Sequence, residues 1–118
     1  LSHNSSMDYK ETVVQAVLGY INSDCKNASL TRIAEDTHQS ITALSKLIKQ
    51  KTGYNFKELL QRKRFQMAVH LLCDTKLSIE EIALDVGYEN QSYFFRQFKE
   101  RYGMTPHKYR KEKLNKKR

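Results

Sequence analysis

Two helices joined by a tight turn are predicted around residues 87–99, which read GYENQSYFFRQFK. Just before them, residues 78–81 (SIEE) form a capping box, in which a Ser and a Glu satisfy backbone groups at the start of a helix. Gly87 follows that helix, at a turn that needs a residue tolerant of positive φ. Asn90 is the expected N-cap of the second helix, and Gly103 ends it.

The second of these helices has two different faces. Phe94, Phe98 and Tyr102 repeat every four residues and are predicted to point into a core. Another face carries groups that bond base edges or phosphates, namely Gln91, Ser92, Phe95, Arg96 and Lys99. This arrangement is typical of a helix-turn-helix motif, whose second helix enters the major groove of DNA. The alternative is a solvated helix of an ordinary bundle, because helix-turn-helix shapes also occur without DNA.

Composition narrows the class of protein. The chain has 118 residues, 39% of them hydrophobic, with a single Pro and four Gly. No period-two alternation is visible, so we expect an all-α fold. The net charge of +8 favours a polyanionic partner, with nucleic acid ahead of an anionic membrane surface. No apolar run approaches the roughly 18 residues that span a bilayer, and no signal peptide is visible. Cys25 and Cys73 lack CxxC spacing, which fits a reduced, cytoplasmic chain.

The helix-turn-helix pattern occurs twice in the chain. Ser29, Leu30, Ile33 and Ala34 are matched 49 residues later by residues of the same kind. Past the turn the offset becomes 50, which pairs Ser40 with Asn90, Leu44 with Phe94, Lys46 with Arg96, and Gly53 with Gly103. The second copy therefore has one extra residue in its turn, and turns are the places where a repeat tolerates an insertion. The repeat therefore predicts two motifs and weakens the bundle alternative.

The remaining elements complete the predicted order. A first helix is expected from Asp8 to about Asn22, and Asn55 is expected to cap a helix from Phe56 to about Cys73 that joins the two motifs. That rod would be roughly 25 Å long, against roughly 34 Å between successive turns of the major groove. Thr105-Pro106 begins a last helix. The predicted division is a disordered N-terminal end (1–7), a first helix-turn-helix lobe (8–54), a linker helix (55–73), a second lobe (74–114) and a basic tail (115–118). The basic C-terminal end reads equally as a solubilising tail or as a phosphate-contacting segment.

A longer pattern runs through residues 79–110, IxxIAxxVGYxNQSYFxRxFKxxxGxTPxxYR, and residues 64–72 read RxxxAxxLL. These two patterns resemble the signature and the linker helix of the AraC/XylS family of bacterial transcription regulators. The resemblance covers about residues 9–113. It implies seven helices in two lobes, with both recognition helices in adjacent major-groove segments on one face of the duplex. It also implies a transcription activator that binds promoter DNA and touches RNA polymerase, with the sensory or dimerisation domain outside this chain.

The first motif departs from the family pattern. His38 stands where the family usually has Gly in the turn, Gln39 where an apolar residue is usual, and Ile48 in place of a common Phe. His tolerates positive φ better than bulky residues do, so we expect the turn to survive. The first motif also offers fewer bidentate donors than the second. We therefore expect the second motif to discriminate more between bases.

The expected DNA contacts fall into two sets. The base-contacting residues are Ile41, Thr42, Ser45, Lys46, Asn90, Gln91, Ser92, Phe95 and Arg96. The phosphate-contacting residues are Ser40, Lys49, Lys99, His107, Tyr109 and Arg110. Phe95 has two alternatives, contact with a thymine methyl or packing on Tyr88 or Tyr93.

The sequence contains no motif that indicates a metal site or a catalytic site. His3, His38, His70 and His107 share no metal-ligand spacing with one another or with the cysteines. There is no Gly-rich phosphate loop or HExxH. We expect no metal, no cofactor and no catalytic residue. A basic helical module that binds nucleic acid without sequence preference, and a helical protein-interaction module, remain as alternative functions.

Overall fold

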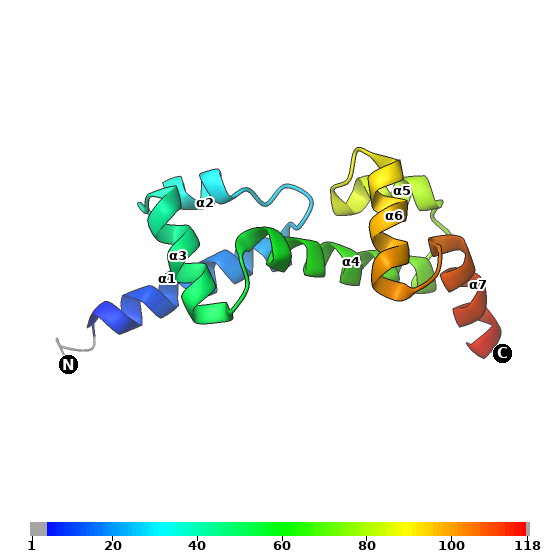
Figure 1. Ribbon diagram of the computed structural model, residues 1–118, viewed down its shortest axis with the longest axis horizontal. Coiled ribbons are helices and arrows are strands. Elements are labelled where there is room, and N and C mark those ends of the chain that lie inside the picture. Colours follow the sequence, from blue (N-terminus) through cyan, green and yellow to red (C-terminus); the bar gives the residue numbers. More distant parts are fainter. Residues whose placement is uncertain (1–4, 118) are drawn as a thin grey trace. The chain divides into compact units, whose positions relative to one another are not determined.

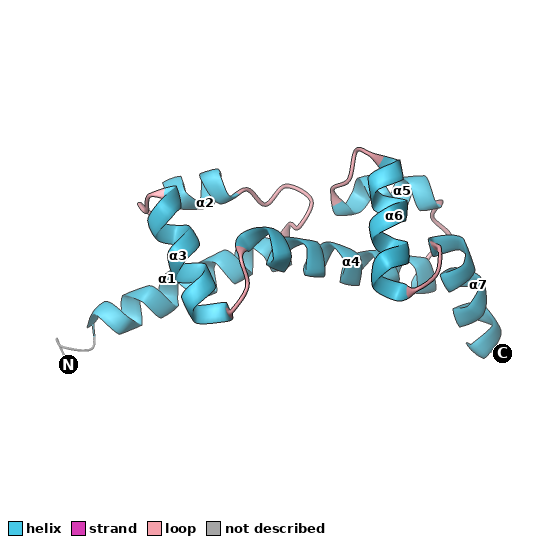
Figure 2. Cartoon of the chain, in the orientation of Figure 1, coloured by secondary structure: helices cyan, strands magenta, loops and turns pink. Residues whose placement is uncertain are grey.

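The computed structural model describes the backbone of residues 5–117 and the side chains of residues 9–114. Within these ranges it has seven α-helices and no strand, as Figures 1 and 2 show, which confirms the predicted all-α fold. The helices are α1 (Ser5–Ser23), α2 (Leu30–Asp36), α3 (Ile41–Thr52), α4 (Phe56–Asp74), α5 (Ile79–Val86), α6 (Gln91–Tyr102) and α7 (Pro106–Lys117). None of the described helices has the length and apolar character that crossing a membrane requires.

The chain ends differ from the prediction where they are described. The first helix begins at Ser5, inside the stretch 1–7 that the sequence predicts as disordered, and residues 1–4 lie outside the described residues. The last helix continues to Lys117, so that most of the predicted tail is helical, and residue 118 lies outside the described residues.

The helices begin and end where the sequence places their caps. Ser78 and Glu81 form the predicted capping box, since the backbone N–H of Glu81 donates to Ser78 Oγ at 3.0 Å and that of Ser78 donates to Glu81 Oε2 at 3.2 Å. Side chains also accept at the starts of the other capped helices, at Ser29, Ser40, Asn55, Asn90 and Thr105. Gly53, Gly87 and Gly103 all have positive φ at helix C-termini. These local interactions confirm the predicted bounds to within a residue or two for most of the helices.

The chain forms two compact units that divide between Lys63 and Arg64, inside α4. The core of the first unit consists of Val13, Val14, Val17, Ile21, Ile33, Ala34, Leu44, Leu47 and Ile48. The core of the second consists of Phe65, Ala68, Leu72, Ile79, Ile82, Ala83, Val86, Tyr88, Phe94 and Phe98. Phe56, Leu59 and Leu60 of α4 pack against the first core. Each half of this helix is therefore a core element of one unit.

Phe65 belongs to the second core. It is not among the predicted core residues, because it directly follows three basic residues in the sequence. It is fully buried. Its ring stacks on Phe94, with centroids 5.5 Å apart and planes 10° from parallel, and it also contacts Tyr88 and Phe98. This aromatic cluster fixes α6 on the C-terminal half of α4.

Candidate nucleic-acid interface

The first helix-turn-helix consists of α2, a turn and α3, which Figure 1 shows in cyan and green. Leu44, Leu47 and Ile48 of α3 are buried. Every residue predicted to contact DNA in this motif is exposed, namely Ser40, Ile41, Thr42, Ser45, Lys46 and Lys49. Lys49 Nζ donates to the carbonyl of Gly53 at 3.1 Å, where a cation also complements the helix dipole. Apart from Ile41, the exposed stripe of α3 is therefore polar and cationic, and the opposite side of the helix packs on the core.

The turn of the first motif is held by a residue outside it. His38 has φ 57°, so it takes the left-handed conformation for which the family usually has Gly. Gln39 Nε2 donates to Tyr9 Oη of α1 at 2.5 Å, and Tyr9 Oη lies 3.5 Å from the carbonyl oxygen of Thr37. The polar residue at position 39 thus has a polar partner. No sequence pattern points to Tyr9 as this partner, because the two residues are 30 positions apart.

The turn of the second motif closes against Arg64 of α4. Gly87 has φ 113°, and a Cβ added there would lie 2.8 Å from Arg64 Cζ. The same guanidinium lies over the ring of Tyr88, with Cζ 5.1 Å from the centroid. Burial raises the pKa of the Tyr88 phenol above its usual 10.0, and the charge of Arg64 acts in the opposite direction. Arg64 therefore belongs to this turn, while Arg62 lies over Tyr54, 4.6 Å from its ring centroid, in the first unit.

The second helix-turn-helix presents α6, on which Phe94 and Phe98 are buried as predicted. Among the residues expected to contact DNA, Ser92, Arg96 and Lys99 are exposed and Gln91 and Phe95 are half-buried. Asn90 is also exposed, but its Oδ1 accepts from the backbone N–H of Tyr93 at 3.0 Å. Because adenine recognition uses both the oxygen and the nitrogen of an amide, Asn90 cannot bind adenine in the bidentate way while it caps α6.

Phe95 does not pack on Tyr88 or Tyr93, the two ring neighbours that the sequence suggests for it. The aromatic rings near Phe95 are those of Phe94, edge-on at 6.1 Å, and His107, stacked at 6.3 Å with planes 17° apart. Tyr88 and Tyr93 instead pack on each other, with centroids 5.7 Å apart. The expected neighbours were wrong because α7 brings His107 beside α6.

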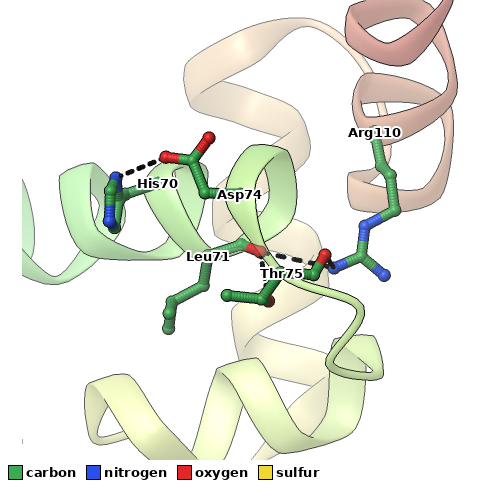
Figure 3. A network of polar contacts seen from close by, with 5 residues as sticks. All are labelled: His70, Leu71, Asp74, Thr75 and Arg110. Carbon is green, nitrogen blue, oxygen red and sulfur yellow. Dashed lines mark hydrogen bonds and ion pairs between the residues drawn. The ribbon is translucent and has the colours of Figure 1, made fainter.

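Arg110 and Tyr109, which are also predicted to contact phosphate, face the interior of the second unit, and Figure 3 shows the polar partners of Arg110. Arg110 Nε donates to the carbonyl of Leu72 at 2.9 Å, and its Nη2 lies 3.5 Å and 3.4 Å from the carbonyl oxygens of Leu71 and Thr75. These carbonyls lie at the end of α4 and just past it, and that of Leu71 also accepts from the backbone N–H of Thr75 at 3.1 Å and from its hydroxyl at 2.5 Å. The ring of Tyr109 is half-buried, edge-on to Phe98 at 5.5 Å. Neither residue is among the phosphate contacts that we propose below.

The geometry defines a class: a protein with two helix-turn-helix motifs, each presenting a polar and cationic second helix on an aliphatic or aromatic core. Residues 33–112 match a family described as a helix-turn-helix domain. The chain belongs to the AraC/XylS family of helix-turn-helix DNA-binding domains.

Relatives and solved structures agree with this membership. The xylose operon regulatory protein of Escherichia coli K12 is 31% identical in an alignment of 109 residues that covers 89% of this chain and 28% of that protein. The C-terminal domain of AraT, a response regulator from Geobacillus stearothermophilus, is 37% identical, with a TM-score of 0.78 over 85% of this chain and 84% of that one. The DNA-binding domain of AdpA, solved with a target DNA, has a TM-score of 0.76 over 84% of this chain and 90% of that one. It is only 19% identical, so it supports the fold alone.

Proposed function

We propose that this chain binds double-stranded DNA sequence-specifically through both helix-turn-helix motifs, as the DNA-binding part of a transcription regulator. The observation that carries the proposal is the same in α3 and α6. Each helix starts at a side-chain cap, buries an apolar stripe and exposes a stripe of polar and cationic residues. Such a stripe matches the hydrogen-bonding edges of bases and the charge of phosphates in the major groove.

The second motif supplies the stronger base contacts in this proposal. Arg96 is exposed on α6 and can form two hydrogen bonds to guanine, and Gln91 can do so to adenine. Asn90 contributes only its amide N–H groups. The other base-contacting residues proposed are Ile41, Thr42, Ser45, Lys46, Ser92 and Phe95. The first motif has no arginine on its exposed stripe, which is why we assign it less discrimination.

Phosphate contacts would supply much of the affinity. The residues proposed for this role are Ser40, Lys49, Lys99 and His107, all of which are exposed. Each phosphate charge that a protein neutralises adds about 0.9 to the slope of log affinity against log salt. We therefore expect Lys99→Ala to lower that slope by about 0.9 while leaving the preferred sequence unchanged.

This chain spans 28% of the length of the xylose operon regulatory protein that it matches. We propose that the full protein activates transcription at a promoter through contact with RNA polymerase, and that a sensory or dimerisation domain lies elsewhere in it. We also propose that lobes 8–54 and 74–114, joined by the helix at 55–73, read adjacent major-groove segments. The support is the family membership and the presence of one recognition helix in each unit.

The test is selection of bound duplexes from a random library at about 0.15 M salt, where loose phosphate contacts are weakened. Two enriched blocks one helical turn apart are expected. A single block would leave one motif as a phosphate clamp. Binding only at low salt without enrichment would support the non-specific alternative. Failure to bind any duplex at low salt would support a protein-interaction module.

A second measurement tests the residue assignment. Arg96→Ala should relax preference at one base pair by about 1–3 kcal/mol. Lys111→Ala removes the same charge from an exposed position outside the proposed contacts and serves as the control. An unchanged preference in Arg96→Ala would contradict the assignment of α6.

A further inference from the structure

We propose that His107 of α7 is a positioning residue for base recognition, because it holds the ring of Phe95 on the recognition helix α6. This inference rests on the proposed function and assigns part of the base readout to a helix outside the helix-turn-helix motif. Phe95 would then contact the methyl group of a thymine. His107 would act on sequence preference through Phe95, which is a different role from neutralising a phosphate.

The ring of Phe95 is held from two directions. It is half-buried on α6, and Ser92 and Arg96 of the same proposed base-contacting face are exposed. Phe94, which is fully buried, lies edge-on to it, with centroids 6.1 Å apart and planes at 74°. His107 stacks on it, with centroids 6.3 Å apart and planes at 17°. Both arrangements are among the favoured geometries of aromatic pairs.

His107 is carried on a helix that is itself anchored at independent points. Thr105 Oγ1 accepts from the backbone N–H of Lys108 at 3.2 Å, and Pro106 is fully buried, so the first turn of α7 is well defined. Arg110 joins the next turn to the C-terminus of α4 by its hydrogen bond to the carbonyl of Leu72, and Figure 3 shows its guanidinium beside Leu71 and Thr75. Tyr109 packs edge-on against Phe98 of α6. The backbone that carries the imidazole is therefore fixed beside α6, and the imidazole itself contacts Phe95.

A fixed ring matters because contact with a methyl group acts only over a short range. Phe95 alone can turn about its side-chain bonds, and each rotamer would place the ring edge at a different point of the groove. The stack on one side and Phe94 on the other restrict that choice before DNA binds. Preorganisation of this kind lowers the entropy cost of binding. Loss of the stack should weaken the preference for thymine without removing the ring.

The experiment replaces thymine by uracil, one position at a time, in the duplex that the wild-type protein selects. Uracil lacks only the methyl group of thymine. Substitution at the position that faces Phe95 should therefore weaken binding by about fourfold, which corresponds to the burial of one methyl-sized group. We expect Phe95→Ala to abolish this uracil penalty and His107→Ala to reduce it to less than about twofold. His107→Phe keeps an aromatic ring without the imidazole and should preserve the penalty.

The same variants separate positioning from phosphate contact. If His107 only contacted a phosphate, His107→Ala and His107→Phe would both keep the full uracil penalty, and that result would overturn the inference. Equal loss of the penalty in both variants would overturn it as well, because the ring of Phe should replace the stack. Circular dichroism verifies that each variant is folded. A wild-type protein that selects no sequence would refute the proposed function itself, whereas a selected sequence without any uracil-sensitive position would refute this inference alone.

Discussion

Replacement of Gly87 by Ala should destabilise the second unit more than the same change at Gly103. Both glycines end a helix of that unit with positive φ, at 113° and 75°. They differ in their surroundings. An added Cβ at Gly103 meets nothing within 4 Å, whereas at Gly87 it would lie 2.8 Å from Cζ and 2.9 Å from Nε of Arg64. The pair therefore separates backbone strain from the contact with Arg64.

The expected magnitude has two parts. The φ of Gly103 is close to the left-handed region, where an L-residue costs about 1–2 kcal/mol, and the reduced freedom of the unfolded chain returns about 0.4–1 kcal/mol of that. Gly87 lies further from any region that Ala populates, with strain of about 1–3 kcal/mol. The new methyl group must also push the guanidinium off the ring of Tyr88, which removes a cation–π contact worth about 0.5–2 kcal/mol. We expect Gly87→Ala to cost about 1–3 kcal/mol more than Gly103→Ala.

Urea denaturation followed by circular dichroism measures the free energy of unfolding of each variant. Both substitutions lie in the second unit, so their costs can be compared directly. The double variant Gly87→Ala/Arg64→Ala is the decisive control, because the side chain that the methyl group displaces is then absent. The cost of Gly87→Ala in that background should fall by about 0.5–2 kcal/mol. Two results would refute the reasoning. One is an equal cost for Gly87→Ala and Gly103→Ala, and the other is an undiminished cost of Gly87→Ala in the Arg64→Ala background.

Three further perturbations test single contacts of the second unit. Ser78→Ala removes one half of the capping box with Glu81 and should lower the free energy of unfolding by about 1 kcal/mol in urea, while Ser78→Asp, which can still cap, should not. Arg110→Ala removes the side-chain donor to the carbonyl of Leu72 at the end of α4 and should cost about 1–3 kcal/mol. Thermal melting should show that Arg110→Lys restores only part of this, and full restoration would indicate a charge effect alone. Because burial raises the pKa of Tyr88, the unfolded state loses its phenol proton first, so the contribution of Tyr88 to stability should be constant below about pH 10 and fall above it. Tyr88→Phe should make that alkaline fall shallower in a pH series of urea melts, and an unchanged slope would contradict the assignment.

The starts and ends of most helices can be predicted from short-range sequence patterns. Caps such as Ser78 with Glu81 join residues three positions apart, and Gly87 or Gly103 ends a helix through its own backbone. Such features depend on chemistry within one helical turn, so they can be predicted without knowledge of the rest of the chain. The repeat of the helix-turn-helix pattern and the family resemblance are also properties of sequence alone.

The contact partners of the arginine side chains could not be predicted from such short-range patterns. Residues 62–64 are three consecutive basic residues (RKR), yet Arg62 lies over Tyr54 and Arg64 over Tyr88. Arg110 reads as a phosphate ligand because it is basic and near the end of the chain. In the structure it caps a helix that ends 36 residues earlier, at Asp74. A charged side chain has the same sequence signal whether it meets a phosphate, a carbonyl or an aromatic face.

The sequence by itself determined the seven helices, their caps, the two motifs and the polar face of α6. These follow from periodicity and from bonds between near neighbours in the chain. Only the tertiary structure decided that Phe65 fills the second core, that Tyr9 holds the turn at Gln39, and that His107 stacks on Phe95. Each of these contacts joins residues that are distant in the chain, or depends on which side of a helix its neighbours cover. Packing in three dimensions selects among partners that a linear pattern leaves equivalent.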